Sequence, residues 1–224
     1  MAEKNVMAHE NEEIIAKAQD FWTRYQKQIT VVLAVVVLAV GGWYAYKNFI
    51  VKPNAEKAVD AMFKAEEYYR MDSLQRALNG DGINWGFVRV IKEYGGTDAG
   101  NLARLYAGDC YLRTGDYNNA VKQLKEYSGD DKLYQARAYK LLGDANSELG
   151  KNDEAIEYYK KSANHFPEDI HNSAEALLFA ASLADKTGKT KEAIELFKEI
   201  KDKFPNTQAA NESEKYLAMH NIYN

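Results

Sequence analysis

The apolar positions of this 224-residue chain follow two patterns: one uncharged run near the N-terminus and, after it, segments with apolar residues at helical spacing. The uncharged run extends from Gln28 to Tyr46, with Lys27 and Lys47 on either side. At about 1.5 Å per helical residue, it is long enough to cross the hydrocarbon core of a bilayer. Aromatic residues stand before the run (Phe21, Trp22 and Tyr25) and at its C-terminal end (Trp43, Tyr44 and Tyr46), as they do at bilayer interfaces. The pattern predicts a transmembrane helix over residues 28–51.

The segment before this run distinguishes an anchor from a cleaved signal peptide. Small residues such as Ala39 and Gly41 would suit a signal peptidase, but a signal peptide begins with a short basic region. Here 27 residues come first, and five of them are acidic: Glu3, Glu10, Glu12, Glu13 and Asp20. We therefore expect an uncleaved anchor that follows an N-terminal segment of residues 1–27.

The charges beside the run do not orient it in a membrane. Three basic residues closely precede it and three follow it: Lys17, Arg24 and Lys27, then Lys47, Lys52 and Lys57. The positive-inside rule needs an excess of Lys and Arg on one side, and a long following domain is translocated largely regardless of its charge. Topology therefore stays open on charge alone.

A fixed spacing recurs three times in the rest of the chain. Gly115, Gly150 and Gly188 each precede an Ala by five residues, and a large apolar residue follows that Ala by four. These later residues are Ala120, Ala155 and Ala193, then Leu124, Tyr159 and Phe197. A small residue stands seven before each glycine (Gly108, Gly143 and Ala181), and Pro167 and Pro205 stand seventeen after the second and third. The copies are offset by 35 and 38 residues, a period typical of helical solenoids.

The chemistry of these residue types explains the spacing. Gly adopts the left-handed conformation that ends a helix, and Pro closes a unit because it cannot continue one. Ala lets two helices approach closely, and the large residue one turn later fills the space that opens beyond it. The spacing therefore predicts pairs of antiparallel helices joined by glycine turns.

These residues resemble the tetratricopeptide repeat, which has small, Gly, Ala, aromatic and Pro residues at the same places. The resemblance implies a tetratricopeptide-repeat helical solenoid. With the uncharged run before it, the expected fold is all-α, with a single N-terminal transmembrane helix followed by this solenoid. Three repeats are expected over residues 101–206, with "PEDIHNS" as the loop before the third.

The segments on either side of the repeats also have helical patterns. Helices are expected over Asn54–Met71 and from Phe87 to Tyr94, with "NGDGINWG" as a loop between them. Together they predict a degenerate leading unit over residues 52–100. A capping helix with a polar outer face is expected within residues 207–224, because the end of a solenoid must face water.

The order of these parts resembles that of the YfgM-like ancillary subunits of the bacterial Sec translocon. The specific features are the acidic N-terminus, the Phe21–Trp22 pair before the apolar run, and Gly42, Trp43 and Tyr46 at its end. The resemblance implies a single-pass protein of the bacterial inner membrane, with a cytoplasmic N-terminus and periplasmic repeats. It also implies that the Sec translocon and periplasmic chaperones or clients are the partners.

Charge and composition exclude several other functions. The 29 basic and 33 acidic residues form no basic stripe, so nucleic acid is not an expected partner. Cys110 is the only cysteine, and the four histidines (His9, His165, His171 and His220) form no metal-binding motif. The "NGDG" segment is too short for a phosphate loop or an EF-hand. We therefore expect no enzyme activity, no cofactor, no metal and no small-molecule substrate.

The remaining candidate site is a protein-binding groove. The first helix of each repeat should face the concave side of the solenoid, which predicts a groove lined by Leu105, Asp109, Arg113, Arg137, Lys140, Asp144, Glu148, Glu175, Leu178 and Ser182. Two functions fit the sequence. One is a membrane-anchored scaffold that binds other proteins, which a groove of mixed charge favours. The other is a structural packing subunit of an envelope membrane complex without client binding, which an exposed apolar strip favours.

Overall fold

The computed structural model describes the backbone of residues 2–222 and the side chains of residues 15–222. Met1, the side chains of Glu3, Glu10, Glu12 and Glu13, and the last two residues of the expected C-terminal cap lie outside this part of the chain. Residues 2–222 contain helices and no β-strand, so the predicted all-α class is confirmed. The helices are α1 (Ala2–Tyr46), a π-helical turn (Lys47–Val51), α2 (Lys52–Arg70), α3 (Leu74–Asn79), α4 (Phe87–Tyr94), α5 (Asp98–Arg113), α6 (Tyr117–Glu126), α7 (Lys132–Glu148), α8 (Asn152–His165), α9 (Ile170–Lys186), α10 (Thr190–Lys203) and α11 (Gln208–Met219).

The chain forms two compact units, Met1–Pro53 and Asn54–Asn224. In the first unit, the apolar side chains of α1 are exposed on every side; Leu38, for example, is 75% exposed. Among residues 15–222, one helical stretch, Ile15–Arg70, is long and apolar enough to cross a membrane, and it contains an 18-residue window with a mean hydropathy of 2.1 that is entirely unburied. This stretch includes the predicted transmembrane segment.

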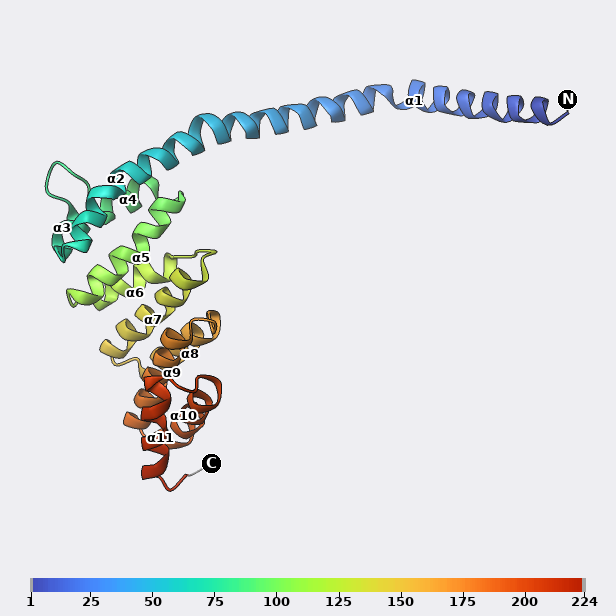
Figure 1. Cartoon of the computed structure of the whole chain (residues 1–224). Coiled ribbons are helices and arrows are strands. Elements are labelled where there is room, and N and C mark those ends of the chain that lie inside the picture. The colour runs from blue at the N-terminus through green and yellow to red at the C-terminus, as the bar shows by residue number, and fades with distance from the viewer. Residues whose placement is uncertain (1, 223–224) are drawn as a thin grey trace. The chain divides into compact units, whose positions relative to one another are not determined.

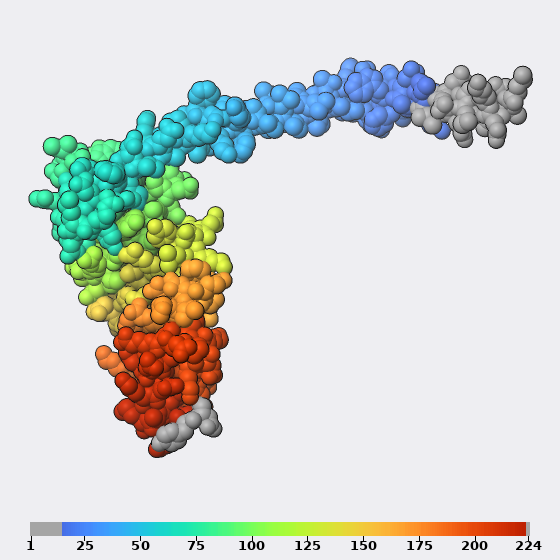
Figure 2. Space-filling view, in the orientation of Figure 1, coloured from blue at the N-terminus to red at the C-terminus, as the bar shows by residue number. Residues whose placement is uncertain are grey.

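The second unit is built from helical hairpins. The pairs α5–α6, α7–α8 and α9–α10 pack against one another in chain order. Figure 1 labels these helices, and Figure 2 shows the same order by colour, ending at the red C-terminal helices. Gly115, Gly150 and Gly188 end the first helix of each pair with φ of 83°, 73° and 79°. After each glycine, the next N–H bonds back to a carbonyl five residues earlier, at 2.8–2.9 Å, which is the Schellman motif. The predicted glycine turns are confirmed.

The small residues of the repeats lie where two helices meet. An ideal Cβ atom on Gly108 would lie 2.4 Å from Cγ of Leu124, and one on Gly143 would lie 2.5 Å from Cδ1 of Tyr159. The alanines on the second helices, Ala120, Ala155 and Ala193, are completely buried. This close packing explains why the same spacing recurs in the three repeats: there is no space for an added methyl group at Gly108 or Gly143.

The leading unit differs in part from the prediction. Helices α2 and α4 lie where two helices were expected, and Met62, Ala65, Phe87 and Val90 form a core with α5. The short helix α3 was not predicted. The loop after it is fixed by Asp81, whose carboxylate accepts hydrogen bonds from Tyr68 Oη at 2.6 Å and from the N–H groups of residues 83 and 84 at 2.9 and 2.6 Å.

Two further expectations concern the ends of the third repeat. The loop "PEDIHNS" is shorter than predicted, because Asp169 caps α9 and the helix begins at Ile170. The expected C-terminal helix is present as α11, capped by Thr207, whose hydroxyl accepts from the N–H of Ala210 at 3.1 Å. Tyr216 holds α11 against the third repeat through two contacts. Its ring stacks on Phe197 with 4.0 Å between the ring centroids, and its hydroxyl donates a hydrogen bond to Asp185 Oδ1 at 2.5 Å.

Candidate functional site

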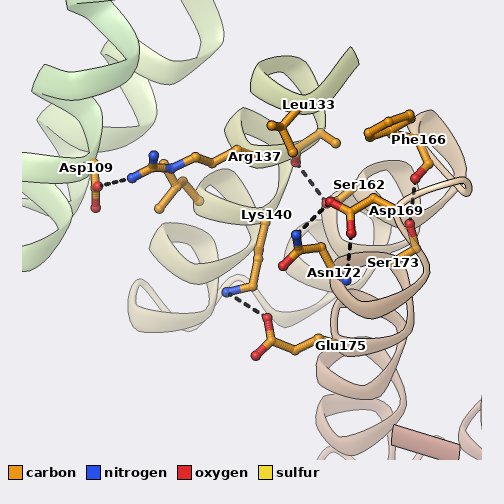
Figure 3. Close-up of a pocket in the computed structure, with 12 residues that line it drawn as sticks. Asp109, Leu133, Arg137, Lys140, Ser162, Phe166, Asp169, Asn172, Ser173 and Glu175 are labelled. Atoms are coloured by element: carbon orange, nitrogen blue, oxygen red, sulfur yellow. Dashed lines mark hydrogen bonds and ion pairs between the residues drawn. The ribbon is translucent and has the colours of Figure 1, made fainter. Parts of the chain in front are cut away.

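A cavity of about 310 Å³ lies between α7 and α9, on the side where the first helices of the repeats line up. Four of the ten predicted groove residues line it: Asp109, Arg137, Lys140 and Glu175. The other lining residues are Leu133, Ala136, Leu141, Ser162, Phe166, Asp169, Asn172 and Ser173. In Figure 3, Arg137 points towards Asp109 on α5, and Lys140 points towards Glu175 on α9.

Helical spacing places these side chains on one face. On α7, Leu133, Arg137 and Lys140 stand four and three residues apart, so they lie one above another along the helix. Asn172 and Glu175 have the same relation on α9. One wall of the cavity is therefore a row of side chains on α7 and the other is a row on α9. Ser162 of α8 also lines the cavity.

Arg137 takes part in a polar network that joins three helices. Its Nη2 donates to Asp109 Oδ2 at 2.7 Å and to the hydroxyl oxygen of Tyr69 at 2.8 Å, and that hydroxyl donates to Asp109. The Asp109 side chain is only 9% exposed, so it depends on these partners. Burial, with the hydrogen bond to Asp109, raises the pKa of Tyr69 to about 12. This network stabilises the fold, and it leaves Asp109 little freedom to bind a partner.

Lys140 is held much less firmly. Its Nζ lies 3.7 Å from Glu175 Oε2 and 3.8 Å from Asp144 Oδ2, beyond ordinary hydrogen-bond distance, and 4.7 Å from the centre of the Phe179 ring. Glu175 is 52% exposed at its side chain. Partly exposed ion pairs of this kind contribute about 0–1 kcal/mol, so either partner can be exchanged for a group of the same charge at small cost. Lys140, Glu175 and Phe179 are the side chains best placed to contact a ligand.

The remaining predicted groove residues lie at several places. Asp144 and Glu148 line a separate cavity of about 330 Å³, where Tyr159 donates to Asp144 at 2.8 Å. Burial raises the pKa of Asp144, and the nearby ammonium of Lys140 opposes the shift. Leu178 lines a third cavity, of about 390 Å³, between α9 and α11, and Glu175 borders both this cavity and the one beside α7.

Arg113 and Ser182, the next two predicted groove residues, line none of these three cavities. Arg113 is exposed and forms an ion pair with Asp72. Ser182 is exposed on α9.

The prediction for Leu105 is wrong. This side chain is 1% exposed and packs in the core with Ala120 and Leu124, so it cannot contact a partner. The partly exposed face of α5 contains Leu102 and Tyr106. Leu105 lies on the side of α5 that packs against α6, the second helix of the same repeat, and not on the side that faces the groove.

Sequence reasoning also missed part of the cavity wall. Phe166, Asp169 and Asn172 come from the turn between repeats and the start of α9, not from the middle of a first helix. Asp169 accepts from the side chain of Asn172 at 2.6 Å and caps α9. The Asp-x-x-Asn spacing at a helix start was the signal that could have placed these residues beside the groove.

Comparison with known families agrees with this architecture. A profile of the tetratricopeptide repeat-like domain matches residues 19–133, and two tetratricopeptide repeat profiles match residues 101–168 and 148–212. No curated protein matches the chain significantly. The first match covers half of the chain and includes the apolar run as well as the leading unit. Tetratricopeptide repeats are modules for protein–protein interaction. The match over half of the chain, with which the helices and glycine turns agree, shows that this chain belongs to the tetratricopeptide repeat-like domain family.

Proposed function

We propose that this protein is a membrane-anchored scaffold that binds segments of other proteins in the cavity between α7 and α9. The observation that carries the proposal is the loosely held pair of Lys140 and Glu175 beside Phe179. The pair offers one ammonium and one carboxylate, and the Phe179 ring, which lines the neighbouring cavity between α9 and α11, adds apolar surface that is 38% exposed. A bound segment that contributes a carboxylate and an apolar side chain would replace the distant contacts of Lys140 with closer ones.

The polar groups at the base of the cavity are already satisfied. Ser162 donates to the carbonyl of Ala136 and Ser173 donates to that of Phe166, both at 2.8 Å. A ligand therefore gains little from these two hydroxyls. Recognition depends on the charged and aromatic side chains at the rim, and this arrangement tolerates varied sequences, as a scaffold for several clients requires.

We further propose that the protein lies in the bacterial inner membrane, with its N-terminus in the cytoplasm and its repeats in the periplasm, and that it links the Sec translocon to periplasmic chaperones or clients. The exposed apolar helix supports an anchor, because the hydrophobic effect disfavours such a surface in water. The Phe21–Trp22 and Gly42–Trp43 pairs support the translocon assignment by resemblance. Added Cβ atoms on Gly41 and Gly42 would meet nothing within 4 Å, so this face is open to a neighbouring membrane helix.

Site-specific photo-crosslinking in cells tests both parts of the proposal. A crosslinker at Lys140 should capture soluble or translocating proteins, and one at Gly42 should capture a membrane subunit of the translocon. The matched control is Glu154, an exposed residue of α8 that is not among the cavity-lining residues described above. If Lys140 captures no more protein than Glu154, client binding in this cavity is wrong. If Gly42 captures no translocon subunit, the translocon assignment is wrong.

Protease accessibility tests the topology separately. Protease added to spheroplasts should digest the repeats and spare a tag at the N-terminus. Protection of the repeats in intact spheroplasts, with digestion after lysis, would reverse the proposed orientation.

One observation favours a second candidate function, that of a packing subunit without clients. Val59 and Phe63 on α2 are 60% and 59% exposed and lie on one face of the helix, and an apolar patch of this kind marks an interaction surface. A subunit of a larger complex would bury them permanently. In the crosslinking experiment, this function predicts adducts from Gly42 and none above the control from Lys140.

A further inference from the structure

A further cleft, of about 530 Å³, lies between α2 and α5 and differs in chemistry from the cavity between α7 and α9. Its walls include Val59, Met62 and Phe63 from α2, and Ala99 and Leu102 from α5. Val59 and Phe63 stand four residues apart, so they lie on one face of α2, and both are about three-fifths exposed. Met62, beside them, is 3% exposed and belongs to the core. The cleft therefore has an apolar floor and an apolar wall that no described element covers.

The charged residues of this cleft all have the same sign. Asp60, Glu66 and Asp98 line it, and no Lys or Arg does. Within residues 15–222, Asp60 and Asp98 have no ion-pair partner, and Glu66 has only Arg70, at 4.0 Å. Three carboxylates around an apolar surface create a negative potential that attracts cations and repels anions.

We propose that this cleft binds an amphipathic helix of a partner protein whose apolar face is flanked by Lys or Arg. The apolar side chains would contact Val59, Phe63 and Leu102, and the basic side chains would pair with Asp60, Glu66 and Asp98. The site is separate from the cavity between α7 and α9 and does not depend on what that cavity binds.

The shape of the cleft favours a helix over an extended segment. Its walls are two helices, whose backbone hydrogen bonds are already made within each helix, so an extended strand would find no backbone partners there. A helix brings its own hydrogen bonds and fits its side chains into the groove between two others. Apolar residues at positions i, i+3 or i+4, and i+7 would face the cleft.

The negative charge of the cleft favours a basic helix over two alternative occupants, a second copy of the chain and an anionic lipid surface. A second copy of the chain, docked by two-fold symmetry, would bring the same three carboxylates against these three, and like charges facing each other disfavour such a dimer. An anionic lipid surface would be repelled for the same reason. A basic helix is the occupant that satisfies the apolar and the acidic residues together.

The test is a titration of the full chain in nanodiscs of neutral phosphatidylcholine. The probe is a fluorescent synthetic helix of about 18 residues, with Leu at one face and Lys on both flanks, which is long enough for five helical turns. The comparison probe has Glu in place of every Lys. We expect the Lys peptide to bind at least tenfold more tightly than the Glu peptide, and added salt to weaken the binding, because exposed charges are screened.

Matched variants locate the binding. Phe63→Asp and Asp60→Lys should each weaken binding of the Lys peptide by at least tenfold. Their controls are Ile83→Asp, a change of the same kind at an 88% exposed residue, and Glu154→Lys on α8; both should leave the affinity unchanged. Phe63→Ala is a milder variant that should weaken binding several-fold and confirm that Asp did not act by unfolding the domain.

Several results would overturn the proposal. Equal binding of the Lys and Glu peptides, or unchanged affinity in Phe63→Asp, would show that the cleft does not recognise a basic helix. A photo-crosslinker at Phe63 in cells identifies the natural occupant: the captured segment should be helical, amphipathic and rich in Lys or Arg. Adducts with a second copy, with lipid or with residues 1–53 of the same chain would each refute it. None of these results bears on capture by Lys140, so this proposal and the client-binding proposal fail independently.

Discussion

Apolar side chains have opposite surroundings in the two units of this molecule. In α1, Val31 and Leu38 are 62% and 75% exposed, and neighbours on all sides of the helix are also apolar. In the repeats, Leu142 and Ile156 are 2% and 1% exposed, and the opposite faces of their helices are polar. The repeats cover their apolar residues with their own helices, whereas the apolar residues of α1 are not covered within their own unit. The difference is visible in the sequence as an uncharged run in one unit and a helical period in the other.

Glycine shows the same contrast on a smaller scale. A Cβ atom on Gly41 would meet nothing within 4 Å, whereas one on Gly143 would collide with the ring of Tyr159. Glycine in the repeats is needed for contacts within the domain, and glycine in α1 leaves a surface open to other molecules. The first two predictions below test this contrast, and the third tests a polar contact within the second unit.

The largest effect is expected from charges in the middle of α1. An Arg at the centre of a membrane helix costs about 2.5–3.5 kcal/mol on insertion scales, so Val36→Arg with Val37→Arg should prevent stable insertion. The unaltered protein should stay in the membrane pellet after alkaline carbonate washing, and the double variant should appear in the supernatant. The control is Ile83→Arg with Met71→Arg, which changes two exposed apolar residues of the second unit. Sedimentation of both variants, or release of the unaltered protein, would show that α1 is not the anchor.

An intermediate effect is expected from Gly143→Ala. The new methyl group would overlap the Tyr159 ring, which is buried and whose hydroxyl bonds to Asp144, so the ring cannot move aside easily. Overpacking costs about 1–3 kcal/mol, and the better helix propensity of Ala returns up to about 1 kcal/mol. We expect a net loss of about 1–2 kcal/mol in the free energy of unfolding, measured by chemical denaturation of the repeats. Gly41→Ala should change this free energy by less than about 0.5 kcal/mol, and equal losses in the two variants would contradict the contrast.

The smallest effect is expected from Tyr69→Phe at alkaline pH. Because the folded pKa of Tyr69 is raised from 10 to about 12, its contribution to stability is complete below pH 10 and is lost as the pH rises through 12. Removing the hydroxyl removes this dependence, so the stability of Tyr69→Phe should fall less steeply than that of the unaltered protein between pH 10 and 12. Urea denaturation at several pH values in this range measures both slopes. Parallel slopes would show that the hydroxyl is not held as described.

The parts of the fold that could be predicted are the turns and helix caps, in which a residue type such as glycine or threonine has one well-defined physical role. The left-handed turns at Gly115 and Gly150 and the cap at Thr207 follow from local chemistry that is written in a few adjacent residues. Helix α3 was missed because its six residues are too few to show a helical period and depend on packing of Leu78 for their structure. Short elements held by tertiary contacts carry little local signal.

The site was predictable only in part, because helical spacing defines a stripe but not which way the stripe faces. Arg137, Lys140 and Glu175 line the cavity between α7 and α9, and their polarity was enough to exclude them from the core. Leu105 could not be assigned in this way, since an apolar residue on a first helix fits either the groove or the core. Only the packing of Leu105 against Leu124 of the second helix distinguishes the two. Errors of this kind are expected wherever a groove contains apolar residues.

The network of Tyr69, Asp109 and Arg137 has a consequence for how the repeats come apart. Arrays of repeats have mainly nearest-neighbour contacts, so they tend to fray from either end, one unit at a time. Here α2, in the leading unit, is tied to α5 and also to α7, two units further along. Opening the leading unit would therefore expose the carboxylate of Asp109 and break a contact of the second repeat at the same time. The leading unit and the first two repeats should open together as one cooperative block, and hydrogen exchange of α2 should be as slow as that of α7.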